Sequence, residues 1–135
     1  MAQRPAVYFW YGATSFVTLV LLLVRIPLGT FNQQTALDAF AHVVLPATVA
    51  PVLYGLLRER VSRSAAVPSF TWLVPIVAGG SAGELLWELF EFAVDRSFGT
   101  AWQVSGTDTV IDIASAVIGT LVGGWLFVRL QRRRP

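Results

Sequence analysis

The chain has 135 residues, of which 55% are hydrophobic and 13% are charged, and its formal net charge is +2 at pH 7. Soluble domains carry about a quarter charged residues, so this composition excludes an ordinary soluble domain and indicates a protein embedded in a lipid bilayer. The absence of cysteine excludes disulfides, thiolate metal sites and cysteine nucleophiles.

Four apolar runs follow one another along the chain, over residues 6–24, 36–57, 70–94 and 108–130. Each has the roughly 20 residues that a helix needs to cross a hydrocarbon core of about 30 Å. The first run is longer than the apolar part of a secretory signal and no small-residue cleavage site follows it, so we expect it to remain as a helix. The sequence therefore predicts an all-α bundle of four transmembrane helices, which forms a single integral membrane domain over residues 1–135.

The basic residues indicate the direction of the bundle in the membrane. All of them are arginine, and with four spans only Arg25 and Arg96 fall on one side. The other side carries Arg4, Arg58, Arg60, Arg63, Arg129, Arg132, Arg133 and Arg134. Because cytoplasmic loops are enriched in basic residues, both termini are predicted to be cytoplasmic. The arginines lie at helix ends and form no amphipathic face, so we expect membrane lipid and no nucleic acid as a partner.

Acidic residues recur along the third span at intervals of four, three and four. Glu84, Glu88, Glu91 and Asp95 fall within an arc of about 60° of a helix surface. They form a stripe that runs for about 16 Å from mid-membrane to the outer surface. An ionised side chain at the centre of a spanning helix costs roughly 2.5–3.5 kcal/mol. Such residues are therefore expected to face one another, bind a cation, hold protons or line a wet cavity.

The second and fourth spans bring polar groups to the same depth. Asp38 and His42, the only histidine, lie one turn apart at the outer start of the second span. Asp108 and Asp112 have the same spacing at the outer start of the fourth span. The three helices are therefore predicted to gather these groups with the acidic stripe in the outer leaflet.

Small residues continue the acidic faces toward the inner leaflet. Gly80 follows Glu84 inward on the third span, and Gly119 and Gly123 follow Asp112 on the fourth. Because small residues allow close approach of helices in lipid, the glycine halves of the third and fourth spans are predicted to meet. Two prolines at 46 and 51 are predicted to kink the second span and open space beside the polar cluster.

The cluster suits several kinds of chemistry. Carboxylates with an imidazole suit a Zn, Mn or Fe cofactor, whereas carboxylates alone suit Mg or Ca. The candidate ligands of a divalent metal are His42, Glu84, Glu88, Glu91, Asp108 and Asp112, with Asp38 orienting His42. Alternatively, Glu88, Glu91 and Asp112 act as acid–base catalysts on a lipid-linked substrate, one donating a proton while its neighbour activates water. Conduction of protons or cations along the stripe is disfavoured, because few polar groups lie inward of Glu84.

A different class of function uses the same residues without catalysis. The polar groups would then fix helix packing in a non-catalytic membrane subunit that assembles with itself or with a larger membrane complex. Individual residues also have local structural interpretations. Asp38 completes a helix-capping box with Thr35, and Asp108 suits the start of a helix. Asp95, followed by Arg96, suits the solvated end of a helix.

Short motifs at these positions resemble a known family. They are Asp38-x-x-x-His42, Glu88-Leu-Phe-Glu91-Phe92, and Asp108-Thr-Val-Ile-Asp112 with Gly119. They resemble the YjdF-like family of small bacterial inner-membrane proteins and, more distantly, VanZ-like proteins, which are associated with glycopeptide resistance. The similarity covers roughly residues 36–124. It implies the topology and the position of the site, and it implies no reaction.

Overall fold

The computed structural model describes residues 5–25, 36–62, 69–103 and 105–132, without the side chains of residues 22–25, 36–38 and 62. These segments fold into α1 (Pro5–Arg25), α2 (Ala36–Ser62), the short 3-10 helix η3 (Phe70–Trp72), α3 (Leu73–Phe98) and α4 (Gly106–Arg132). No strand occurs among the described residues, so the predicted all-α fold is confirmed. The helices contain the predicted spans and extend beyond most of them by a few polar or charged residues.

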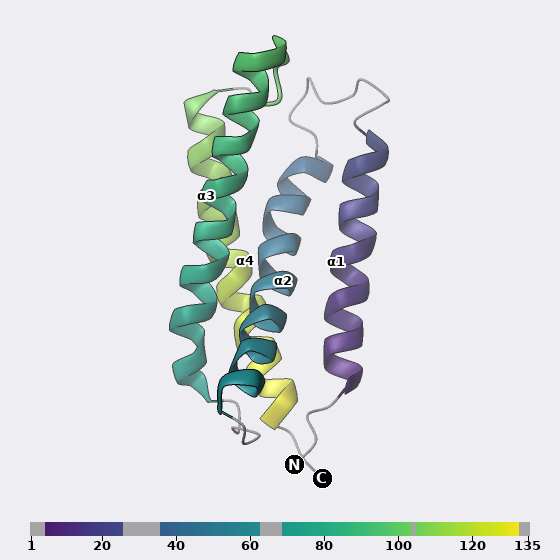
Figure 1. Cartoon of the computed structure of the whole chain (residues 1–135), viewed down its shortest axis with the longest axis vertical. Coiled ribbons are helices and arrows are strands. Elements are labelled where there is room, and N and C mark those ends of the chain that lie inside the picture. The colour runs from purple at the N-terminus through teal and green to yellow at the C-terminus, as the bar shows by residue number, and fades with distance from the viewer. Residues whose placement is uncertain (1–4, 26–35, 63–68, 104, 133–135) are drawn as a thin grey trace.

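The helices run side by side along the long axis of the molecule (Figure 1). The start of α1 and the end of α4 lie at one end, and the connection from α3 to α4 lies at the other. Three described stretches are long and apolar enough to cross a membrane, namely Ala39–Val61, Phe70–Phe98 and Gly106–Arg132. The first helix contributes a shorter apolar stretch, Pro5–Leu21, where the sequence predicted a fourth full span. The cytoplasmic placement of both termini stays a prediction.

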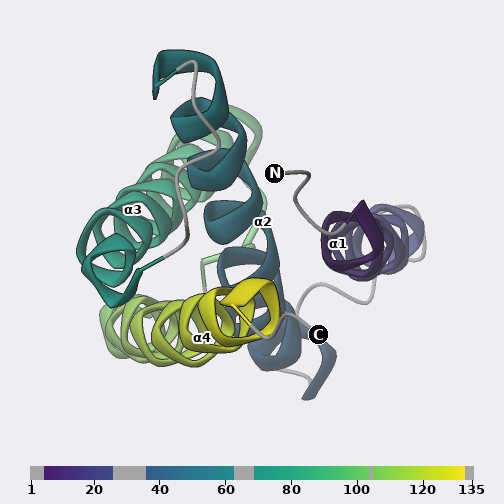
Figure 2. The ribbon, with the colours of Figure 1, turned by 90° about the horizontal axis from the view of Figure 1, so that it is seen from below.

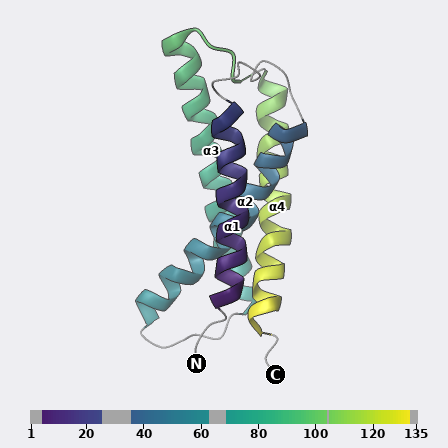
Figure 3. The same ribbon diagram turned by 90° about the vertical axis from the view of Figure 1, so that its right-hand side faces the viewer.

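The second helix lies obliquely across the others. It remains helical through Pro46 and Pro51, which remove backbone hydrogen bonds and favour bending. Viewed along the bundle and from its side, α2 is strongly inclined, and its last turns project from the bundle (Figures 2 and 3). The space expected beside the polar cluster is present as a cavity lined mainly by residues of α2 and α3, together with Leu19 of α1 and Trp102.

Glycines lie at close helix contacts, both between α2 and α4 and between α3 and α4. A Cβ atom on Gly119 would meet the backbone carbonyl oxygen of Val43, and one on Gly123 would meet that of Ala47. Gly119 and Gly123 therefore pack against α2 and not against α3, whereas the Cβ of a third glycine of α4, Gly124, would meet Ile76 of α3. A Cβ on Gly80 would meet the side chain of Thr120, so this glycine does serve the contact between α3 and α4.

The apolar core lies toward the end of the bundle where α1 begins and α4 ends. Its buried residues are Val7, Trp72, Ile76, Phe127 and Val128. Polar contacts attach α1 to this region, because the Tyr11 hydroxyl donates a 2.8 Å hydrogen bond to the Gly123 carbonyl oxygen. The buried acidic residues lie in the other half of the bundle, so the two halves differ in chemistry.

Candidate metal centre

Three helices each contribute a buried polar side chain to one group in the acidic half. His42 comes from α2, Glu88 from α3 and Asp112 from α4, and their exposed fractions are 6%, 3% and 6%. The i, i+4 periodicity of the acidic stripe places Glu84 and Glu88 on the inner face of α3, where Glu84 is also buried. Helix amphipathicity is thus inverted here, with carboxylates inside and leucine and phenylalanine side chains outside.

The spacing of this group fits a bound cation. One potential ligand atom from each of His42, Glu88 and Asp112 lies within 4.8 Å of the others. Ligands at about 2.0–2.6 Å on opposite sides of one cation are roughly 4–5 Å apart. A cation between the three side chains would therefore need only small side-chain movements to reach bonding distance from all of them.

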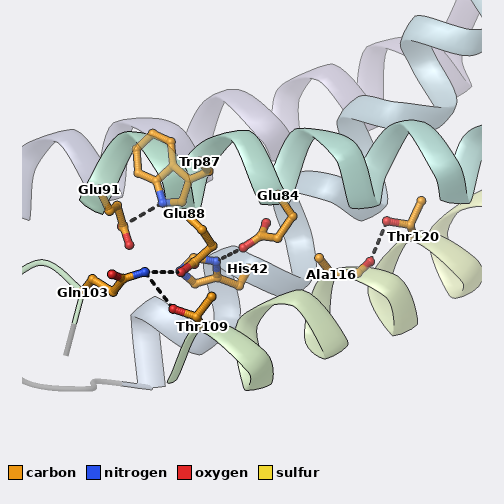
Figure 4. Close-up of polar contacts among 9 residues, drawn as sticks. All are labelled: His42, Glu84, Trp87, Glu88, Glu91, Gln103, Thr109, Ala116 and Thr120. Carbon is orange, nitrogen blue, oxygen red and sulfur yellow. Dashed lines mark hydrogen bonds and ion pairs between the residues drawn. The ribbon is translucent and has the colours of Figure 1, made fainter. Parts of the chain in front are cut away.

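A fourth side chain orients the imidazole. Glu84 Oε1 and His42 Nδ1 form a short hydrogen bond that joins α3 to α2 (Figure 4). Metal-binding histidines usually hold one ring nitrogen on a carboxylate and present the other to the metal. The sequence assigned this orienting role to Asp38, whose side chain lies outside the described residues. In the structure, the carboxylate of Glu84 makes this kind of contact with the His42 ring.

Only one of the two carboxylate oxygens of Glu88 has a hydrogen-bond partner among the described residues. Its Oε2 accepts a hydrogen bond of 3.2 Å from Gln103 Nε2, which also donates a 2.8 Å bond to Thr109 Oγ1 (Figure 4). Its Oε1 is buried and has no hydrogen-bond partner among the described residues. Leaving a buried charged acceptor unpaired costs at least about 1–3 kcal/mol. A bound proton or a cation at this oxygen would remove that cost.

Comparison with known families identifies the class of protein. The family model described as "Predicted membrane protein (DUF2238)" matches residues 4–133. The chain belongs to this family. No curated protein and no solved structure matches the chain.

As a multi-pass member of the DUF2238 family, the protein carries this polar group inside membrane-spanning helices. Water is therefore largely replaced by protein and lipid around Glu84, Glu88 and Asp112. An ionised group at the centre of a span costs several kcal/mol unless it is paired. In their ionised forms, three carboxylates with one imidazole would carry an excess of negative charge, which a divalent cation would offset.

The connection from α3 to α4 is folded so that Gln103 reaches Glu88. Asp95 accepts backbone N–H bonds of 2.9 Å from both Trp102 and Gln103, and Thr100 donates its hydroxyl to the same carboxylate. Gly99 ends α3 in the left-handed conformation, with φ at 65°. Asp95 thus organises this connection outside the three-residue group. Gln103 is not among the predicted site residues, since a single glutamine in a connection has no periodicity that points to the bundle interior.

The remaining predicted residues lie beside the group. Glu91 is buried and accepts a 2.8 Å hydrogen bond from Trp87 Nε1. Asp108 is buried near the start of α4, where its backbone N–H donates to Ser105 Oγ at 3.2 Å as in a helix cap. Neither belongs to the group of three, so their roles as ligands stay predictions.

Proposed function

We propose that this membrane protein binds one divalent cation through His42, Glu88 and Asp112, with Glu84 orienting the imidazole. The observation that supports this most strongly is the buried Glu88 Oε1, which lacks a hydrogen-bond partner among the described residues and belongs to a group of ligand-type side chains. A cation would give that oxygen a ligand bond and offset the excess negative charge.

The chemical types of the three ligands indicate which metals the site would prefer. One nitrogen and two carboxylates suit Zn, Mn or Fe better than Mg or Ca, which prefer all-oxygen sites. In this assignment Glu84 changes from a predicted ligand to a positioning residue, because its carboxylate is engaged with His42 Nδ1.

We further propose that the cation serves chemistry on a lipid-linked substrate. A bound divalent metal would polarise a substrate oxygen as a Lewis acid. Glu91 lies one turn beyond Glu88 and lines the cavity with His42 and Glu84, so it is placed to exchange a proton with a group that enters there. The motif resemblance to YjdF-like proteins supports the position of this site and names no substrate, and the VanZ-like resemblance is more distant.

Metal analysis tests the cation site. Protein purified in detergent and dialysed against trace Mn²⁺ or Zn²⁺ is expected to retain about one divalent metal ion per chain, and EDTA should remove it. At a free metal concentration of 100 times Kd, binding stabilises the fold by about 2.7 kcal/mol, so EDTA should also lower the unfolding temperature. A chain that retains no metal and unfolds at the same temperature with and without EDTA would show that the polar group only fixes helix packing.

A further inference from the structure

A cavity extends along the membrane-embedded surface between α2 and α3, with Leu19 of α1 also in its lining. It has a volume of about 440 Å³, and its lining extends from Ala41 to Leu57 on α2 and from Pro75 to Glu91 on α3. At 1.5 Å per residue each of these stretches is about 24 Å long, which is most of a hydrocarbon core of about 30 Å. This cavity is called the groove below, and a lining that extends over this length fits an extended chain better than a compact solute.

The groove is apolar along most of its length and open to the surroundings. Leu45, Val49 and Leu53 line it from α2, and the last two are exposed at the surface. Its described lining includes neither arginine nor lysine. In a chain whose family is membrane-embedded, the medium that meets such an opening is the acyl region of the bilayer.

Two glycines leave the floor of the groove unfilled. A Cβ atom built on Gly79 or on Gly83 meets no other atom within 4 Å, although both residues line the groove. The intervening Gly80 behaves differently, because its Cβ would meet Thr120 of α4. Helix packing therefore accounts for Gly80 and leaves the space at Gly79 and Gly83 without a protein occupant among the described residues.

One end of the groove is polar. His42, Glu84 and Glu91 line it there, with Trp87 and Trp102 beside them. His42 belongs both to this lining and to the group of three potential metal ligands. A molecule lying in the groove would thus bring one end to the His42 side of the candidate metal centre, whose other two members, Glu88 and Asp112, do not line the groove.

We propose that the groove holds one hydrocarbon chain of a membrane lipid and that the phosphate of the same lipid faces the cation at its polar end. The carboxylates alone would repel a phosphate, and the described lining has no arginine or lysine, so the cation is the group that would attract the head. This inference deepens the proposed function by naming its substrate class, and it rests on that function for the head-group contact. The contact with the hydrocarbon chain depends only on the groove.

Native mass spectrometry of the detergent-purified full chain tests the proposal. The probes are dioleoyl phosphatidic acid, dioleoylglycerol and inorganic phosphate, each added with Mn²⁺ or with EDTA. The wild-type chain is expected to retain one phosphatidic acid with Mn²⁺, and EDTA should reduce this retention to the level of dioleoylglycerol. Inorganic phosphate should bind at least tenfold more weakly than phosphatidic acid, since it has no chain to occupy the groove.

Matched leucine substitutions show whether the groove is the binding site. Gly83→Leu and Gly79→Leu should each reduce retention of both lipids at least tenfold, because the new side chain fills the groove. Ala82 lies on the exposed surface of α3 outside the groove lining, so Ala82→Leu should leave retention unchanged. The new side chains at positions 79 and 83 have open space, so an unfolding temperature at or above that of the wild type is expected and verifies the fold.

The outcomes of these experiments distinguish the hydrocarbon-chain site from the metal site. Equal lipid retention by the wild type and both groove variants would overturn the proposal even if the chain binds metal. A stable dimer that excludes lipid from the groove would overturn it as well. If metal analysis of the same samples finds no cation while both groove variants lose lipid, the metal function is wrong and the hydrocarbon-chain site is supported.

Discussion

Glu88→Gln is expected to weaken divalent-cation binding strongly and, in the same protein, to stabilise the metal-free fold. The substitution removes a ligand oxygen and one negative charge from the buried group of His42, Glu88 and Asp112. An amide also has N–H groups that can donate to a neighbouring carboxylate, whereas the present Glu88 Oε1 lacks a hydrogen-bond partner among the described residues. We expect metal affinity to fall at least a hundredfold and the free energy of unfolding in EDTA to rise by about 1–3 kcal/mol.

Glu91→Gln provides the matched control. Glu91 is a buried glutamate on the same helix, one turn from Glu88, and lies outside the group of three. Isothermal titration with Mn²⁺ and thermal unfolding with and without EDTA should show near-wild-type binding for this variant. If Glu88→Gln instead destabilises the protein equally in Mn²⁺ and in EDTA, then Glu88 acts as a packing residue and the metal assignment fails.

Gly119→Ala is expected to destabilise the protein by about 1–3 kcal/mol and to weaken cation binding. Its Cβ would meet the backbone carbonyl of Val43 on α2, and backbone atoms cannot move away as a flexible side chain can. Because Val43 follows His42 in the chain, a displaced α2 would also move the imidazole. Unfolding in a denaturing detergent and Mn²⁺ titration measure the two effects.

Gly12→Ala tests whether close packing is the cause. Gly12 also lies inside a helix, but a Cβ there meets nothing within 4 Å. Alanine has the higher helix propensity, so this variant should be as stable as the wild type or more stable by up to about 1 kcal/mol. Equal destabilisation by both substitutions would mean that the contact between Gly119 and Val43 does not hold the helices together.

The sequence predicted the structure best where a large energetic cost applies to residues that recur at a regular spacing. Apolar runs of bilayer length predicted the helices, because exposing them to water or breaking their backbone hydrogen bonds in lipid is costly. The same cost predicted that Glu84, Glu88 and Asp112 would lie inside the bundle. Their low exposed fractions and the proximity of Glu88, Asp112 and His42 agree with this placement.

Which helices and side chains contact one another was less predictable from the sequence. The helical period correctly placed Gly119 and Gly123 on one face, but it carries no information about which helix packs against that face, and this helix is α2. The contact from Gln103 to Glu88 depends on how Asp95 folds the connection between α3 and α4, which involves no repeating pattern. The pairing of Glu84 with His42 likewise required the mutual rotation of two helices.

Electron spin echo spectroscopy of the Mn²⁺-loaded chain tests the central claim most directly, since it detects nitrogen atoms bonded to the metal. The predicted result is one bound Mn²⁺ per chain with nuclear coupling to a single imidazole nitrogen, and loss of that coupling in His42→Gln. Bound Mn²⁺ without any nitrogen coupling in the wild-type chain would contradict a cation shared by α2, α3 and α4.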